Sequence, residues 1–504
     1  MKEYVEKIKI LESDLVSDIQ KYTFYTKTKY FSFVATVKMF LLAKLLKIDE
    51  GEIILYKTNK QIAFRSLLNS IISKGFIESF GEGPIYSDYP RLFIIGMDYF
   101  INKSKTDQKM RAWGCVFPFE DKEIAYAKSL GEAVERNATY FLESENMRKY
   151  PKIIHGDASF LYEYIPKFTK KQIEKDKRMV SSERDLTLVR GFFVNSITGD
   201  KKRFLPLPFI YWGETSRKDE KISFHNTSSG GGGGITYEQA FLSAIYETIE
   251  RDHFLLYWFS GVNPNIISND SIPGAFGDYV RKAIKDYNLE IYFLDTKYDL
   301  DVKSCVCVVI DPVLNIITMG GKAHSSSIET LKSSLIEAIL VIVNTREREK
   351  MMSESELFDI LKEKTFTKKL GRLDRVNLYC SQKGIAMVKK QFLNGVTISY
   401  KEFSDGEKEF SSKKEEKEFT VSLFKDLVIK KGKGYHIYHH KATSVWTEEL
   451  DYEVCSVFVP ALLKLHLEEI LATPVSERLF LFAKEKGKPI NNENDIVTLP
   501  HFFP

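Results

Sequence analysis

The sequence predicts a mixed α/β fold, made of internally repeated β/α units and carrying a helical N-terminal extension. One observation is that strand-like runs alternate with helical runs of about twelve to twenty residues over most of the chain, which is typical of a mixed α/β architecture. A second is that two helical runs share Glu-x-x-Glu-Arg followed by an aromatic segment. Such repetition indicates that one supersecondary unit is used more than once.

Residues 1–72 form the predicted extension. The segments 34–48 and 60–76 place apolar residues at helical spacing, and Gly75 ends the second segment. A helix pair followed by a short extended piece predicts either a winged-helix-like module or a helical extension packed on the main domain. The pattern leaves both alternatives open.

Residues 73–504 form the predicted main domain. Its strand-like runs lie at 91–100, 289–296, 304–311, 315–321 and 452–460, and its related helices lie at 127–141, 242–258 and 331–344. Residues 401–418 are mostly charged or small, so we expect an exposed loop or a solvated hairpin tip there. A proline-bearing tail occupies residues 491–504.

Composition and charge argue against several classes of function. The formal net charge is +4, and no basic run is interleaved with aromatic residues, so we expect no nucleic-acid partner. The first residues are charged throughout, unlike a signal peptide. The longest apolar runs, such as 338–343, are far shorter than the roughly 20 residues that span a bilayer. We therefore expect a cytoplasmic protein without membrane contact.

The five cysteines are scattered and include no CxxC pair. Their spacing therefore predicts neither a structural zinc site nor a disulfide framework. Cys305 and Cys307 share one face of an apolar strand-like run, and we expect both to fill the core.

The repeated helices carry the residues with the clearest chemical signal. On a helix, positions i, i+3 and i+4 share one face, so each Glu-x-x-Glu-Arg motif forms a single patch. Four carboxylates in one place need a cation between them, and oxygen ligands suit magnesium. Paired arginines suit the phosphate groups that magnesium binds. The alternative is an ordinary surface helix with intrahelical ion pairs. The residues are Glu132, Glu135 and Arg136 in the first helix, and Glu247, Glu250 and Arg251 in the second.

Five consecutive glycines, Gly230 to Gly234, precede the second of these helices. Bare backbone amides before a helix N-terminus can bind an anion. The run is neither a Walker A motif, since Gly-Lys-Ser/Thr is missing, nor a GxGxxG motif, since Ile235 stands where glycine is needed. A flexible loop is the alternative.

Taken together, these segments resemble the YcaO family, ATP-dependent enzymes that activate backbone amides of peptides. The resemblance spans about residues 73–504. It rests on GEAVER in the first helix, TSSGGGGGITYEQAFLSAIYETIERDHFLLYW in the second unit and GGKAHSSSIETLKSSLIEA in the third. EVCSVFVPALLKLH and the PHFFP ending add further support.

The resemblance implies which residues bind the cofactors ATP and Mg²⁺. It implies that Glu132, Glu135, Glu247 and Glu250 coordinate magnesium ions bridging the phosphates, and that Arg251 and Arg136 touch the phosphates. The nucleotide would lie along Ser228, Ser229, Gly230, Gly231 and Gly232. Other family contacts fall on Lys128, with Ser129 beside it, and on Gln239, which stands where the family has glutamate.

The resemblance also implies a reaction. A Cys, Ser or Thr side chain of a ribosomally made precursor peptide attacks the preceding amide carbonyl, ATP phosphorylates the resulting oxyanion, and phosphate leaves to give a thiazoline or oxazoline. Positioning and metal charge carry most phosphoryl transfer, so no protein nucleophile is required. By the family's habit, a separate ThiF-like, leader-binding protein delivers the peptide and a dehydrogenase joins the complex. A homodimer stays open.

The tail distinguishes branches of the family. Azoline-forming members commonly end in PxPxP, whose terminal carboxylate reaches the active site. Here Pro500 and Pro504 keep the outer prolines and Phe502 replaces the middle one, so the resemblance implies a catalytic role for Pro504 together with Arg251. Members that form thioamides or amidines generally lack this tail and are the nearest alternative. A catalytically weak, peptide-binding scaffold is another, favoured by Leu340 and Asn344 where the family has Gln and Arg.

Overall fold

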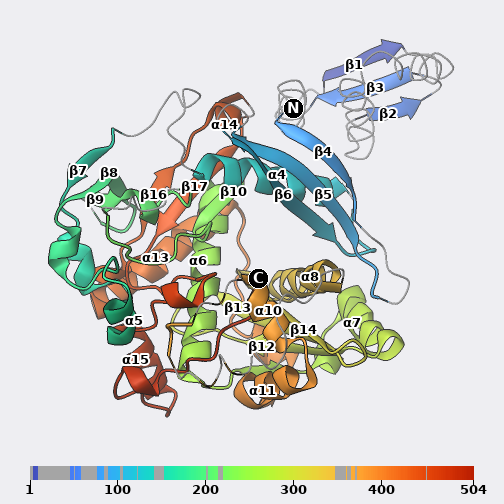
Figure 1. The fold of residues 1–504 in the computed structure, drawn as a ribbon. Coiled ribbons are helices and arrows are strands. Elements are labelled where there is room, and N and C mark those ends of the chain that lie inside the picture. The colour runs from blue at the N-terminus through green and yellow to red at the C-terminus, as the bar shows by residue number, and fades with distance from the viewer. Residues whose placement is uncertain are drawn as a thin grey trace.

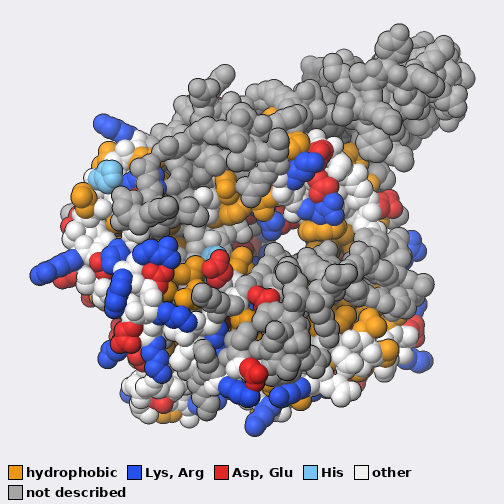
Figure 2. Space-filling view, in the orientation of Figure 1, with side chains coloured by type: hydrophobic (Ala, Val, Ile, Leu, Met, Phe, Trp, Pro, Cys, Tyr) orange, Lys and Arg blue, Asp and Glu red, His pale blue; other side chains and the backbone are white. Residues whose placement is uncertain are grey.

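A computed structural model gives the fold of the chain (Figure 1). It describes residues 4–9, 46–49, 52–57, 76–83, 89–102, 106–121, 123–140, 152–199, 202–213, 220–346, 359, 362, 365–368, 370, 372–449 and 451–503. Figure 2 shows basic and acidic side chains interspersed over one face of the molecule. Among the described residues, no helix combines the length and the apolar character that crossing a bilayer requires.

The described part of residues 1–72 is a small antiparallel sheet. It contains β1 (Tyr4–Lys9), β2 (Leu46–Asp49) and β3 (Glu52–Lys57) in the order β1-β3-β2. The last residues of the first expected helix, 46–48, lie in β2, whereas 34–45 and 60–75 lie outside the described residues. The winged-helix-like and helical-extension alternatives therefore stay predictions.

The first layer of the main domain is a three-stranded sheet covered by a helix. Strands β4 (Ile77–Glu82), β5 (Phe93–Asn102) and β6 (Thr106–Val116) pair in that order. Helix α4 (Glu123–Thr139) packs on them through Leu130, Ala133 and Val134, which share a core with Met97 of β5. The strand expected at 91–100 and the helix expected at 127–141 are confirmed.

The second sheet of the main domain has six strands. Its order is β10-β17-β16-β8-β7, with β9 also paired to β8. The strands are β7 (Ile154–Gly156), β8 (Val189–Ser196), β9 (Arg203–Pro206), β10 (Gly231–Gly234), β16 (Tyr438–Lys441) and β17 (Glu453–Phe458). The strand expected at 452–460 is β17. Helix α5 (Lys170–Lys175) lies in the connection between β7 and β8.

The third sheet has the order β14-β13-β12-β11-β15 and carries helix α8 (Ser327–Arg346) on one face. Its strands are β11 (Asn265–Ile267), β12 (Glu290–Asp295), β13 (Lys303–Asp311), β14 (Ile316–His324) and β15 (Thr397–Ile398), and helix α7 (Gly274–Tyr287) precedes β12. Three expected strands and the third expected helix are therefore present. Cys305 and Cys307 are fully buried in β13, as expected of core residues.

Helix α6 (Tyr237–Ser260) runs through the centre of the molecule (Figure 1). It begins at the N-cap Thr236, whose side chain accepts the Gln239 amide, and ends at Gly261 in the left-handed conformation. Its N-terminal half packs in one hydrophobic cluster with β17, and its C-terminal half packs in another with the chain's tail. The helix is buried along most of its length, which fixes the side chains that it directs into the site.

The loop expected at 401–418 is present only at 405–412, between two helices, so this prediction was wrong in part. Helix α12 (Tyr400–Ser404) begins at a capping box of Ser399 and Glu402, and α13 (Lys413–Lys431) begins at the N-cap Ser412. Most side chains are exposed, as predicted, but Phe403 and Glu416 are buried. The serine-to-glutamate spacing was a helix signal that the charge run concealed.

The remaining helices complete the C-terminal part: α10 (Arg372–Tyr379), α11 (Gln382–Phe392), α14 (Val445–Glu449) and α15 (Glu477–Glu485). Short 3-10 helices lie at Ser159–Glu163, Glu183–Leu186, Leu207–Phe209, Asn269–Ser271, Lys433–Tyr435, Glu469–Leu471 and Glu493–Asp495.

Candidate active site

Three helices direct glutamates toward one another, and each follows a strand or turn that holds its first glutamate. That glutamate accepts a hydrogen bond from a backbone N–H of the preceding segment in all three cases. The donors and acceptors are Trp113 N to Glu132 Oε2 (2.7 Å), Gly230 N to Glu247 Oε2 (3.3 Å) and Gly321 N to Glu337 Oε2 (2.8 Å). The repeat predicted for α4 and α6 therefore extends to α8.

Two arginines partly neutralise these carboxylates. Arg136 Nη2 lies 2.6 Å from Glu132 Oε1 on α4. Arg251 is 9% exposed and contacts three carboxylates. Its nitrogens lie 3.3 Å from Glu247, 3.0 Å from Glu250 and 3.9 Å from Glu337. Arg251 thus joins the acidic patch of α6 to the glutamate of α8.

Burial, helped by the remaining negative charge, raises the pKa of three glutamates. Burial, followed by the charges of Glu247 and Glu132, raises the pKa of Glu135 to about 8. Burial raises the pKa of Glu250 to about 7 against the opposing effect of Arg251, and the charge of Glu337 adds to the rise. Burial also raises the pKa of Glu132. The carboxylates of α4, α6 and α8 therefore act on one another as one group. We call this group the acidic cluster; it consists of Glu132, Glu135, Glu247, Glu250 and Glu337.

The donor set fits a hard cation. In the structure as it stands, no three His, Cys, Asp or Glu side chains within the described ranges are placed to hold a metal ion together. However, Glu250 Oε1 is buried and accepts no hydrogen bond, although Arg251 Nη1 lies 3.0 Å away. Carboxylate oxygens are the ligands that Mg²⁺ prefers, and a cation would offset the burial and the repulsion that together raise the pKa of Glu135 and Glu250.

The glycine run is neither a linker nor a loop over most of its length. Gly231–Gly234 form β10, which pairs antiparallel with β17. A Cβ on Gly232 would lie 2.3 Å from the Ala244 nitrogen, so only glycine lets β10 approach α6 this closely. Gly230 has a φ of +90° at the turn into the strand. Gly231 faces the other way, where a Cβ would lie 3.4 Å from Glu135 Oε1.

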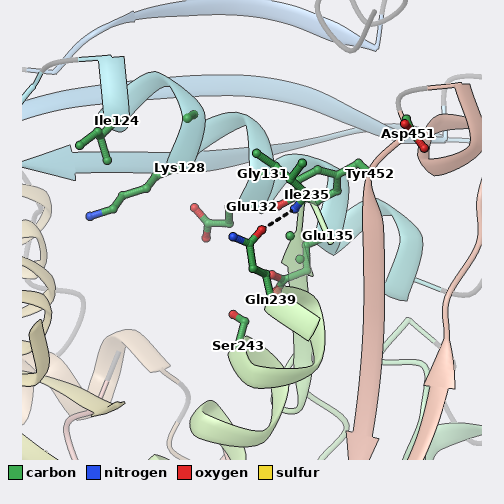
Figure 3. A pocket seen from close by; sticks show the side chains of 13 residues that line it. Ile124, Lys128, Gly131, Glu132, Glu135, Ile235, Gln239, Ser243, Asp451 and Tyr452 are labelled. Atoms are coloured by element: carbon green, nitrogen blue, oxygen red, sulfur yellow. Dashed lines mark hydrogen bonds between the residues drawn. The ribbon is translucent and has the colours of Figure 1, made fainter. Parts of the chain in front are cut away.

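A cavity of about 410 Å³ opens beside Glu132 and Glu135, between α4, β10 and the start of α6 (Figure 3). Lys128 and Gln239 line it on opposite sides, and Tyr452 lies at its edge. Gln239 Oε1 accepts the Ile235 amide at 3.1 Å. Lys128 Nζ donates to the Cys115 carbonyl at 3.3 Å, and burial lowers its pKa.

The structure places other expected contacts outside this cavity. Ser129 is fully buried and donates to the Ala112 carbonyl of β6. Gly232 faces α6 rather than the open space. Ser228 and Ser229 line a separate small cavity of about 10 Å³, together with Gly230, Gly231 and Lys464.

The tail reaches the acidic cluster. Phe503 is buried, and its ring centroid lies 4.2 Å from the Arg251 guanidinium carbon. Upstream, the Leu499 carbonyl accepts the Trp258 indole N–H at 2.7 Å, and His501 lies 2.9 Å from Arg375 Nη1. The catalytic role expected of Pro504 stays a prediction because this residue lies outside the described residues.

Sequence reasoning missed two side chains of the cluster. The helix expected at 331–344 was related to the other two, but its glutamate, Glu337, was given no role, although the small, apolar residues before it match those of an equivalent position. Phe503 was treated as part of a proline-bounded tail. Nothing in the local sequence showed that its ring would lie on Arg251.

Comparisons with known proteins agree with this geometry. A family model described as YcaO cyclodehydratase, ATP- and Mg²⁺-binding, matches residues 120–463. A heterocyclase solved in complex with substrate and cofactor has a TM-score of 0.66 at 14% identity, covering 89% of this chain and 57% of that one. The chain thus spans little more than half the length of that enzyme. No curated protein sequence shows a significant match.

Two further solved structures share the fold. YcaO from Methanopyrus kandleri, bound with AMPPCP and Mg²⁺, has a TM-score of 0.57 at 14% identity, covering 84% of this chain and 95% of that one. A chain of the E. coli microcin synthetase McbBCD complex has a TM-score of 0.50 at 12% identity, with coverages of 84% and 96%. At these identities the likeness shows the fold alone. Since the family model covers more than half of the chain, this protein belongs to the YcaO family of ATP- and Mg²⁺-binding enzymes.

Proposed function

We propose that the chain is an ATP- and Mg²⁺-dependent cyclodehydratase that converts Cys, Ser or Thr of a ribosomally made precursor peptide to thiazoline or oxazoline. The observation that carries the proposal is the acidic cluster, in which carboxylates of α6 and α8 converge on the buried Arg251 and act electrostatically on the glutamates of α4. The carboxylates carry more negative charge than the nearby arginines can neutralise. The set is therefore better suited to binding magnesium and its phosphates than to forming structural ion pairs alone.

Glu132, Glu135, Glu247 and Glu250 are the proposed magnesium ligands, and Glu337 extends the set. Bound magnesium would supply positive charge to the phosphate oxygens during phosphoryl transfer. Arg136 and Arg251 would bind phosphate oxygens that the metal leaves uncovered.

The cavity beside α4 is the proposed place of the nucleoside. It adjoins Glu132 and Glu135, so a nucleotide seated there would direct its phosphates toward the cluster. Lys128 and Gln239 offer polar contacts on its two sides (Figure 3). The turn from Ser228 to Gly231 faces another small cavity. Only the family resemblance, and not the position of the larger cavity, therefore supports contacts between its backbone and phosphate.

The chemistry balances without a protein nucleophile. The substrate thiol or hydroxyl adds to the carbon of the preceding amide, and the oxyanion takes the terminal phosphoryl group of ATP, releasing ADP. Loss of the amide proton and of the phosphorylated oxygen as phosphate forms the C=N bond of the azoline. Arg251 would stabilise the charge that develops on the transferred group. Its contact with Phe503 limits the orientations that its guanidinium can take.

The proposed substrate complex includes further chains. A leader-binding, ThiF-like protein would present the precursor peptide, and a dehydrogenase would oxidise azolines to azoles. The fold shared with a chain of the McbBCD complex supports assembly of this kind. A homodimer is compatible with the same arrangement.

Mass spectrometry of a Cys/Ser/Thr-rich precursor incubated with the chain, its leader-binding partner, ATP and Mg²⁺ tests the proposal. Loss of one water per modified residue is the expected result. Exchange of oxygen for sulfur would instead identify a thioamide-forming enzyme, and loss of water with a new amidine link would identify a macroamidine-forming one. An unchanged peptide mass together with peptide binding would identify a scaffold and overturn the proposal.

A further inference from the structure

The third repeat unit lacks the cation that the other two carry. Arg136 and Arg251 each stand four residues after the first glutamate of their helix, whereas Val341 stands four residues after Glu337. The nearest arginine nitrogen to Glu337 belongs to Arg251, at 3.9 Å. The cluster is therefore least neutralised on the side of α8.

Lys322 of β14 lies on that side. It directly follows Gly321, whose amide is bonded to Glu337. Its ammonium acts electrostatically on Glu250 in the cluster and on Lys128, which lines the cavity. Lys322 is half-buried, and in the described part of the chain its side chain has no hydrogen bond or ion pair. Residues two apart on a strand share a face, so Lys322 lies on the same face of β14 as Gly320, where a Cβ would lie 2.6 Å from Glu337 Cβ.

The charges around Lys322 favour an anionic ligand. The ammonium group of Lys322 acts unfavourably on that of Lys128, which lines the cavity. Glu250 lies 3.0 Å from Arg251, whereas no ion pair joins it to Lys322 among the described residues. An anion between the two lysines would turn their repulsion into attraction for both.

We propose that Lys322 is a phosphate-binding residue of the active site, supplying from β14 the positive charge that α8 lacks. This inference rests on the proposed function, because the phosphates are those of the nucleotide. It assigns to the third unit the same task that Arg136 and Arg251 perform in the first two, with the cation placed on the strand instead of the helix.

Calorimetric titration with Mg²⁺ and AMPPCP, Mg²⁺ and ADP, or adenosine tests the inference. Lys322→Met and Lys322→Gln are expected to weaken AMPPCP and ADP binding about tenfold, the loss of one charge-assisted contact. Adenosine, which has no phosphate, is expected to bind each variant as it binds the wild type. Lys322→Arg keeps the charge and should retain most of the affinity.

Lys441→Met is the matched control, since Lys441 also lies on a strand but pairs with Glu453 at the surface. Wild-type affinity for AMPPCP in both neutral variants at position 322 would overturn the inference while leaving the proposed function intact. Equal weakening of adenosine and AMPPCP would also overturn it, because the effect would then be structural. Failure of the wild type to bind AMPPCP would overturn the proposed function itself, and the inference with it.

Discussion

Magnesium binding is expected to release protons from the acidic cluster, and the amount follows from two pKa values. Glu135 has a pKa of about 8 and Glu250 one of about 7. At pH 7, about 0.9 of the first group and about 0.5 of the second are therefore protonated before the cation arrives. A ligand carboxyl group must lose its proton, so these two groups should contribute about 1.4 protons at pH 7 and about 0.6 at pH 8, to which Glu132, whose pKa is also raised, would add. Because both pKa values are raised, affinity should increase as pH rises from 6 to 8.

Calorimetry in buffers of different ionisation enthalpy measures this release directly. The proton release of nucleotide and Mg²⁺ mixed without protein is subtracted. Glu135→Gln removes one of the two groups, so at pH 7 its release should fall by about 0.9 protons. Glu329→Gln, an exposed glutamate of α8 that pairs with Lys332, should leave the release unchanged. A release near zero at pH 7, or an affinity that stays constant from pH 6 to 8, would refute the reasoning.

Three substitutions give further tests. Glu247→Gln should abolish peptide-dependent ATP hydrolysis while the melting temperature stays near that of the wild type; full hydrolysis would remove the metal-site argument. Gly232→Ala forces a Cβ into the backbone of α6 and should lower the free energy of unfolding by about 3 kcal/mol. Gly81→Ala is the control, because open space surrounds that residue, and should change the free energy little. Denaturant titration measures both values. Phe503→Leu keeps most of the packing but removes the ring face below Arg251, and should lower kcat/KM for Mg-ATP about tenfold; an unchanged value would show that the ring does not position the arginine.

The apolar periodicity predicted element types well and helix starts less well. The expected strands correspond to β5, β12, β13, β14 and β17, and the expected helices to α4, α6 and α8. Each helix begins about one turn earlier than its apolar pattern. In α6 the reason is visible, since Thr236 caps a first turn whose residues are partly exposed, so the hydrophobic signal starts only at Ala240.

The glycine strand could not be predicted from local sequence. Glycine has a low strand propensity, and a run of five has no alternation of polar and apolar side chains. What makes Gly231–Gly234 a strand is pairing with β17, more than 200 residues later, and contact with the backbone of α6. The same holds for Phe503, whose contact with Arg251 depends on the path of the whole tail.

The sequence predicted which residues belong to the acidic cluster better than it predicted which residues they contact. Glu132 and Glu247 are expected to bind a metal, which stays a prediction, and in the structure they pair with Arg136 and Arg251. The sequence pattern contains both possibilities, because a glutamate four residues before an arginine can form an ion pair or can leave both groups to a bound ligand. Only convergence of three such helices, which depends on tertiary structure, distinguishes a site from a surface helix.

The ion pairs of the cluster also indicate how the site would load. Five carboxylates face two arginines, so the fully ionised cluster carries three uncompensated negative charges apart from the two lysines at its edge. Arg251 Nε has no hydrogen-bond partner and can donate without breaking the ion pair with Glu247. A contact that draws Arg136 or Arg251 away from its glutamate is costly while that carboxylate has no other cation. Magnesium would remove this cost, and phosphate would in turn complete the coordination of magnesium. Metal and nucleotide are therefore expected to bind as one unit, because magnesium balances the glutamates while the arginines contact phosphate.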